Sequence, residues 1–128
     1  MRIENDIKLD YKDVLFRPKR STLHSREEVD VSRKFTFKNA QQDWQGIPII
    51  ASNMDTVGTI EMAKALAQHK IITCLHKFYT AEELQPLFTD DIADFVAVSS
   101  GIKNDDVEFL SKLTAQIPQI KFICLDAQ

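Results

Sequence analysis

Glycine and cysteine are scarce in this sequence of 128 residues, which contains three glycines and two cysteines. Gly46, Gly58 and Gly101 lie too far apart to form a glycine-rich loop, the usual cradle of backbone amides for a phosphate. Cys74 and Cys124 lie in apolar runs, with no CxxC spacing and no histidine placed so as to suggest a metal site. We therefore expect reduced core thiols and no metal site.

Long apolar runs and an excess of one charge are also lacking. No run approaches the roughly eighteen apolar residues that cross a bilayer, and the amino terminus has no signal-peptide core. Sixteen basic and nineteen acidic residues give a net charge of -3, which does not indicate nucleic acid or an anionic membrane as a partner. With 44% hydrophobic and 27% charged residues, the composition predicts one globular domain, or part of one. The lack of a signal peptide and of a membrane span predicts a cytoplasmic location.

Four short apolar runs alternate with segments of helical character. Each run is continuous rather than alternating, which favours strands that are covered on both faces. Strand and helix alternating at this spacing indicate parallel pairing through crossovers, so the predicted class is α/β. The predicted strands are "IPIIAS" (47–52), "IITCL" (71–75), "DFVAVS" (94–99) and "KFICL" (121–125).

Helical patterns fill the first two gaps. Residues 59–69 place apolar side chains at helical spacing, which gives the helix one face to pack on a sheet. Thr80 and Glu83 form a capping-box pattern at the start of a second helix. Pro86 should kink or shorten that helix.

A third helix is predicted to begin at a cap on Asn104 or Asp105 and to continue to about Gln116, before Pro118. Ahead of the first predicted strand, "EEVDVSRKFTF" alternates enough to be a strand or hairpin, and Trp44 is expected to cover one end of the sheet. This extension is interpreted as structural.

Polar residues follow every predicted strand. In parallel α/β sheets, ligands meet the carboxyl ends of the strands, so these residues should share one rim. They are Ser52, Asn53, Met54, Asp55 and Thr56 after the first strand, His76 and Lys77 after the second, Ser99, Ser100 and Gly101 at the third, and Asp126 after the fourth.

Each of these residues also has a structural interpretation. Asp55 or Thr56 could cap the following helix, Met54 could belong to the core, and His76 could be an ordinary loop residue. The segment from Ser99 to Gly101 fits a tight turn. Lys77 could be solvated, or it could bind an anionic cofactor or take part in proton transfer or imine chemistry.

Several strings closely resemble the amino-terminal part of the GMP reductase family, in order and at similar spacing. They are "LDYKDVLFRPKRSTLHSREEVDVSRKFTF", "GIPIIASNMDTVGT", "ITCLHKFY", "AVSSG" and "IKFICLD". The related IMP dehydrogenases share "NMDTVG" but usually carry a regulatory insertion after the second strand. Only about fifteen residues separate Tyr79 from Phe95, which favours the reductase.

The resemblance implies a partial (β/α)8 TIM barrel, with residues 1–128 forming its amino-terminal half: the first four parallel strands and a strand or hairpin extension. Family members are usually homotetramers that use NADPH to convert GMP to IMP and ammonia. Their catalytic cysteine lies in a glycine-rich loop beyond residue 128, and Cys74 and Cys124 match strand positions instead. We therefore expect residues 1–128 alone to be inactive, with strand edges left for the remaining strands to pair.

Site residues follow from the same resemblance. Lys77 and Asp126 match catalytic positions that also contact NADPH, and Ser25, Arg26 and Ala127 match further cofactor-binding positions. Ser52 and Met54 match positions that line the base of the nucleotide. After Asp126, Ala127 and Gln128 replace the usual continuation of the family, which suggests a truncated or disrupted reading frame or an incomplete chain.

Three other functions stay open from the sequence. One is an IMP dehydrogenase-like oxidoreductase that lacks its regulatory domain. Another is a class I aldolase-type barrel in which Lys77 forms an imine with a carbonyl substrate. The last is a non-catalytic fragment with a structural or interaction role.

Overall fold

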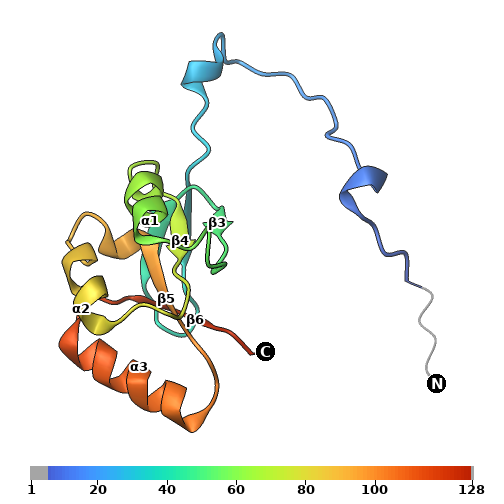
Figure 1. The fold of residues 1–128 in the computed structure, drawn as a ribbon. Coiled ribbons are helices and arrows are strands. Elements are labelled where there is room, and N and C mark those ends of the chain that lie inside the picture. Colours follow the sequence, from blue (N-terminus) through green and yellow to red (C-terminus); the bar gives the residue numbers. More distant parts are fainter. Residues whose placement is uncertain (1–5, 128) are drawn as a thin grey trace. The chain divides into compact units, whose positions relative to one another are not determined.

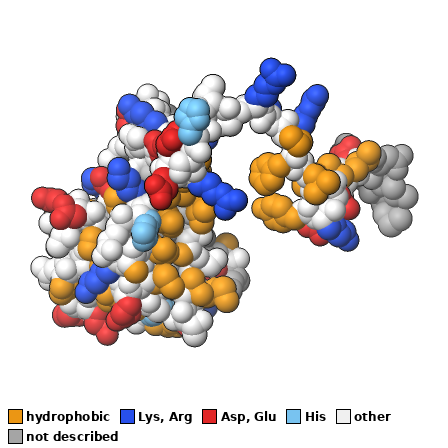
Figure 2. Space-filling view, turned by 90° about the horizontal axis from the view of Figure 1, so that it is seen from above, with side chains coloured by type: hydrophobic (Ala, Val, Ile, Leu, Met, Phe, Trp, Pro, Cys, Tyr) orange, Lys and Arg blue, Asp and Glu red, His pale blue; other side chains and the backbone are white. Residues whose placement is uncertain are grey.

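The computed structural model describes residues 6–127 and divides into two units, residues 1–30 and 31–128. The predictions that concern the first five residues and Gln128 therefore lie partly outside the described residues. Within the first unit, short 3₁₀ turns span Tyr11–Asp13 and Arg26–Glu28. This unit exposes many apolar side chains, visible as an orange cluster in Figure 2; they include Ile7, Leu9, Tyr11, Leu15 and Phe16. No helix among the described residues is long and apolar enough to cross a membrane.

The second unit begins with an antiparallel hairpin of β1 (Arg33–Thr36) and β2 (Asp43–Gly46). Trp44 of this hairpin is buried, and its indole N–H donates to the Asp94 carbonyl at 2.8 Å. It packs with Ile72 and Ala97 near the amino ends of the parallel strands. The prediction of a hairpin whose tryptophan covers one end of the sheet is confirmed.

The main sheet is four-stranded and parallel, in the order β3 (Ile50–Ala51), β4 (Ile72–Cys74), β5 (Val96–Ser100) and β6 (Phe122–Leu125). Neighbours in the sheet are also neighbours in the sequence, as consecutive crossover connections require. All four strands lie within the predicted apolar runs except for the last residue of β5. The predicted α/β class is confirmed.

The helices are α1 (Ile60–Ala67), α2 (Ala81–Leu84) and α3 (Asn104–Gln116), with 3₁₀ turns at Gln85–Leu87 and Ala93–Phe95. The Thr80–Glu83 capping box is present, and Pro86 lies in the 3₁₀ turn that ends α2 after one turn, as predicted. The predicted cap of α3 is wrong. The capping residue is Lys103, whose backbone N–H donates to the Asp106 carboxylate at 3.1 Å.

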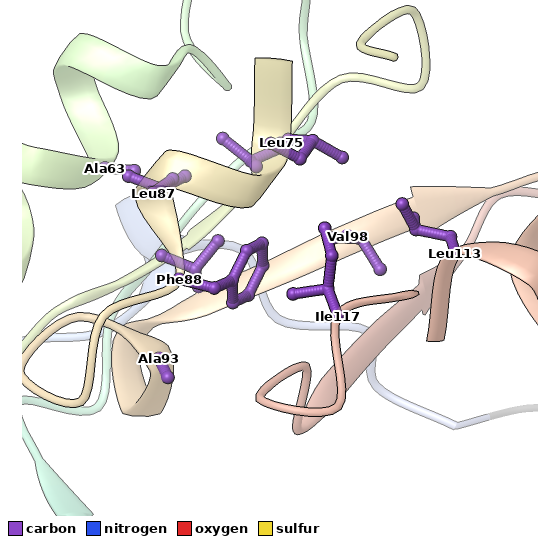
Figure 3. Close-up of a cluster of buried hydrophobic side chains, with 10 residues drawn as sticks. Ala63, Leu75, Leu87, Phe88, Ala93, Val98, Leu113 and Ile117 are labelled. Carbon is purple, nitrogen blue, oxygen red and sulfur yellow. The ribbon is translucent and has the colours of Figure 1, made fainter. Parts of the chain in front are cut away.

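The helices cover one face of the sheet, and this face holds the main core (Figures 1 and 3). Ala63 of α1, Leu84 of α2 and Leu113 of α3 meet Val96 and Val98 of β5 there, each at most 3% exposed. The opposite face carries Ile72, Ala97 and the half-buried side chains of Cys74, Phe122 and Cys124. Successive side chains of a strand point to opposite faces, which explains this division.

Candidate functional site

The segment after β3 forms a tight turn before α1 begins. The Met54 carbonyl accepts hydrogen bonds from the Val57 N–H at 2.9 Å and the Gly58 N–H at 2.7 Å. Because this turn separates the strand from the helix, Thr59 is the capping residue, and its hydroxyl accepts from the Met62 N–H at 3.2 Å. The alternative in which Asp55 or Thr56 caps the helix is therefore wrong.

The segment after β4 is fixed by His76 and Tyr79. The His76 N–H donates to the Gly58 carbonyl at 2.9 Å, and its ring stacks on Tyr79 with 4.1 Å between centroids. The Tyr79 hydroxyl accepts from the Ile60 N–H at 3.1 Å, at the start of α1. His76 therefore has a structural role as a loop residue, and it holds the next residue, Lys77, at the carboxyl end of β4.

Lys77 is exposed, and its ammonium lies 5.9 Å from the centroid of the Phe78 ring. At that distance the ring face attracts the cation weakly. Lys77 belongs to none of the ion pairs found among the described residues. Its charge is therefore free to meet an anion from solvent.

The segment after β6 joins the strand ends through Asp126. Its backbone N–H donates to the Ser100 carbonyl at 2.8 Å, which continues the pairing of β5 and β6 by one residue. Its carboxylate accepts a long hydrogen bond from the side-chain amide of Asn53, at 3.4 Å. Residues 73 positions apart in the sequence thus meet at the same rim.

A cavity of about 380 Å³ opens between these strand ends. This volume is within the range of small-molecule sites, and the lining combines a cation, carboxylates, an amide and an aromatic ring. Its location at the carboxyl ends of parallel strands is where such sheets place ligand sites. The cavity is lined by Asn53, Met54, Asp55, Lys77, Phe78 and Asp126.

The structure brings together three of the predicted site residues: Met54, Lys77 and Asp126. Met54 is 60% exposed, which contradicts the alternative in which it belongs to the core. Ser52 directly follows β3 but does not line this cavity, and Ala127 is exposed immediately after Asp126.

Ser25 and Arg26 belong to the first unit, residues 1–30. Within that unit, the Ser25 hydroxyl accepts from the Glu27 N–H at 3.2 Å and caps a 3₁₀ turn. Arg26 is the first residue of that turn and is exposed. The pair is thus held at adjacent positions with the arginine side chain open to solvent.

Ser100 fits the structural interpretation of the third strand end. It is 4% exposed, and its hydroxyl donates to the Asp106 carbonyl at 3.3 Å and to the Gly101 carbonyl at 3.2 Å. These bonds tie the end of β5 to the first turn of α3. Ser99 is 7% exposed and makes no such bond, because its buried hydroxyl oxygen has no hydrogen-bond partner among residues 6–127.

Asn53, Asp55 and Phe78 also line the cavity. The sequence placed Asn53 and Asp55 on the rim without assigning either a role, and it did not single out Phe78. Each lies next to a residue that was selected, so adjacency to a strand end was the available signal. The sequence did not show that the Asn53 amide hydrogen-bonds to Asp126, because the two residues meet only through the order of strands in the sheet.

A nicotinamide dinucleotide fits the chemistry of these residues. Its phosphates need a cation, which Lys77 offers, and its ring needs a partly apolar wall with nearby polar groups, which Met54, Phe78 and Asn53 offer. The described residues contain no cluster of three or more metal-ligating side chains.

The fold and the cavity define an α/β protein with a candidate ligand site at the carboxyl ends of its parallel strands. A family model described as IMP dehydrogenase / GMP reductase domain matches residues 8–89. The chain belongs to the IMP dehydrogenase/GMP reductase family.

Two GMP reductases are similar in sequence over nearly the whole chain. GMP reductase 1 from Homo sapiens is 51% identical over 127 residues, and GMP reductase from Klebsiella pneumoniae is 53% identical over 130 residues. Both alignments cover 98% of this chain but 37% of the relative, so the chain spans little more than a third of their length.

A solved structure supports the same fold. Inosine 5' monophosphate dehydrogenase from Legionella pneumophila has a TM-score of 0.65 and 27% identity, and the match covers 91% of this chain and 34% of that one. The four-stranded parallel sheet is thus part of a TIM barrel, as predicted.

Proposed function

We propose that this chain is the amino-terminal half of the barrel of a GMP reductase, which reduces GMP to IMP and ammonia with NADPH as cofactor. The observation that carries the proposal is the meeting of Lys77, Asp126 and Met54 around one cavity at the strand ends. These are three of the residues that match functional positions of the family. The roughly 50% identity to GMP reductases along the chain supports this branch of the family.

Lys77 is proposed to bind the cofactor and to support the reaction. An exposed ammonium at the edge of the cavity can pair with a phosphate of the cofactor, which supplies the hydride when bound. The contacts of His76 with Gly58 and Tyr79 hold the backbone before Lys77 in place. The entropy cost of ordering this segment when the cofactor binds is therefore small.

Asp126 is proposed to position the nicotinamide end of the cofactor and to assist proton transfer as ammonia leaves. Its backbone is fixed by Ser100, and the long bond from the Asn53 amide leaves its carboxylate with further acceptor capacity. A carboxylate held in this way can accept and return a proton at the reacting centre.

Four other residues are proposed to complete the contacts of this half. Ser25, Arg26 and Ala127 are assigned to the cofactor, and Ser52 joins Met54 at the base of the nucleotide. By resemblance, the catalytic cysteine and the phosphate-binding glycines belong to the other half of the barrel, and the whole protein is a homotetramer. We therefore expect the 128 residues alone to have no turnover, because the reacting group is missing.

A chimera tests this proposal. Residues 1–127 would be joined to the part of human GMP reductase 1 that this chain does not match. NADPH oxidation that depends on GMP is the expected activity, whereas the 128-residue chain, with its length verified by intact mass, should show none.

The proposal fails if the folded chimera is inactive with GMP and NADPH. The second candidate function is an IMP dehydrogenase-like oxidation of IMP, which the structural match to the Legionella enzyme favours. It would be identified by reduction of NAD with IMP in the same chimera. Borohydride trapping with a carbonyl substrate would identify imine chemistry at Lys77 instead.

A further inference from the structure

Asn53 lines the candidate cavity together with Lys77 and Asp126, and the proposed function gives it no contact with a ligand. Its side chain is half-buried, so part of it can meet a bound molecule. Its backbone is closely packed, because a Cβ added to Gly58 would lie only 3.1 Å from the Asn53 Cα. The next residue, Met54, is held by the two hydrogen bonds that its carbonyl accepts. A fixed turn therefore presents Asn53 to the cavity.

The hydrogen bond to Asp126 determines which way the Asn53 amide points. An ionised carboxylate only accepts hydrogen bonds, whereas an asparagine side chain carries an NH₂ donor and a carbonyl acceptor. The amide nitrogen must therefore face Asp126, and the distance from Nδ2 to the carboxylate Oδ2 is 3.4 Å. Because Oδ1 and Nδ2 leave the same planar carbon in different directions, the Oδ1 atom is turned away from the carboxylate.

The Asn53 Oδ1 atom is thus an acceptor that remains available. Within residues 6–127, the side chain of Asn53 hydrogen-bonds to Asp126 through its nitrogen, and its oxygen accepts no hydrogen bond there. A carbonyl oxygen in a partly enclosed site favours a ligand that brings a donor to it. The ligand group that fits this position therefore carries a hydrogen on nitrogen or oxygen.

Both ligands of the proposed function carry an amino group at the reacting end. The purine of GMP has the amino group that leaves as ammonia, and the nicotinamide of NADPH has a carboxamide. Asp126 is proposed to lie at this end, and Asn53 hydrogen-bonds to Asp126. The Asn53 oxygen therefore lies beside the two amino groups rather than beside the phosphates, which are assigned to Lys77.

We propose that the amide oxygen of Asn53 accepts a hydrogen bond from an amino group of the bound ligand, either the purine amino group of GMP or the carboxamide of NADPH. This inference rests on the proposed function, which supplies the two ligands. Asp126 keeps the amide in the accepting orientation, so no rotation is needed when the ligand binds. A site built to accept an N–H discriminates against the analogue that lacks it, because its oxygen is then left unpaired.

Calorimetric titration of the chimera with two matched pairs of ligands tests the proposal and separates the two sources of the N–H. GMP is compared with IMP, which lacks the amino group. NADPH is compared with its 3-acetylpyridine analogue, in which a methyl ketone replaces the carboxamide. Asn53→Leu keeps the size of the side chain without its polar atoms. It should weaken the amino-bearing member of one pair about 10-fold, the scale of one hydrogen bond, and the other member by less than about 2-fold.

Asn104→Leu is the matched control. Asn104 is exposed at the start of α3 and does not line the cavity, so all four dissociation constants should stay unchanged. If Asn53→Leu does not fold, Asn53→Ala makes the same test without added volume. Equal affinity for both members of each pair in the unsubstituted chimera would overturn the proposal whether or not any variant folds.

Other outcomes also decide against the proposal. Asn53→Leu could weaken both members of a pair equally, as the loss of a contact with a ribose hydroxyl would, or it could change neither pair; each result overturns the proposal, and so does a folded chimera that binds none of the four ligands. Binding needs no turnover. A chimera that shows the expected pattern of binding but does not oxidise NADPH with GMP would therefore refute the proposed function alone.

Discussion

Replacing Gly58 by alanine should open the candidate site and destabilise the fold. A Cβ at this position would lie 2.3 Å from the Cys74 carbonyl oxygen and 3.0 Å from the His76 nitrogen. Side-chain carbons do not approach closer than about 3.0 Å, so the backbone would have to move by at least 0.7 Å, the difference from 2.3 Å. Neither neighbour is a side chain that could rotate away.

The magnitude follows from overpacking and from two hydrogen bonds. Overpacking a rigid site costs about 1–3 kcal/mol. The same movement strains the bonds from the His76 N–H to the Gly58 carbonyl, at 2.9 Å, and from the Gly58 N–H to the Met54 carbonyl, at 2.7 Å. Each contributes about 1 kcal/mol. We expect the free energy of unfolding to fall by about 3 kcal/mol, within the range that these two effects allow.

Gly101→Ala is the matched control. Its added Cβ would lie 2.3 Å from an Asp106 carboxylate oxygen, which belongs to a side chain that can rotate. That rotation costs only the bond to the Lys103 N–H, about 1 kcal/mol. Neither glycine has a positive φ, and both substitutions restrict the unfolded chain equally, so the difference isolates the contact.

Urea denaturation followed by fluorescence measures both variants. Trp44 is the single tryptophan and is 8% exposed at the amino end of the sheet, so its emission reports global unfolding. The reasoning is refuted if Gly58→Ala loses less than about 1 kcal/mol, or no more than Gly101→Ala. In the chimera, Gly58→Ala should also raise the KM for NADPH or GMP, because the segments bearing Asn53 and Lys77 separate.

The other predictions concern single side chains. Lys77→Ala in the chimera should lower kcat/KM for NADPH strongly while leaving the urea midpoint nearly unchanged; near-parental kcat/KM would mean that Lys77 is merely solvated. Asp126→Asn in the chimera should fold normally and lose about 100-fold or more in turnover, as expected for a positioned acid or base; a lowered melting temperature with unchanged turnover would remove it from the site. Cys74 should react with iodoacetamide roughly 10-fold more slowly at pH 8 than a thiol with the ordinary pKa of 9.0, because its pKa of about 11 lowers the thiolate fraction about 100-fold while the more basic thiolate is about 10-fold more nucleophilic; mass spectrometry of labelled peptides over time measures the rate, and labelling as fast as that of a free thiol would contradict it.

Local signals in the sequence succeeded where neighbouring residues decide the structure. The capping box of Thr80 and Glu83 and the short helix before Pro86 follow from contacts three to five residues apart. The same kind of reasoning failed at α3. The Asp106 carboxylate accepts a hydrogen bond from the backbone N–H of Lys103, so Lys103 is the capping residue. Lysine is not among the residue types that favour the cap position, so the sequence pattern did not select it.

The sequence by itself determined the class and the rim of the candidate site. Continuous apolar runs between helical segments are enough to predict parallel strands, and parallel strands must end on one side. Lys77 and Asp126 could therefore be assigned to a common edge before any distance was known. Their membership in one cavity required the observed strand order.

Only the tertiary structure decided which distant residues meet. Asn53 reaches Asp126 across 73 positions, and Cys74 shares a face with Cys124 across β5. Such meetings depend on strand register, because a shift by one residue turns every side chain of a strand to the other face. Periodicity reports that a strand exists and where it ends, whereas register is set by packing between strands, which no short stretch of sequence contains.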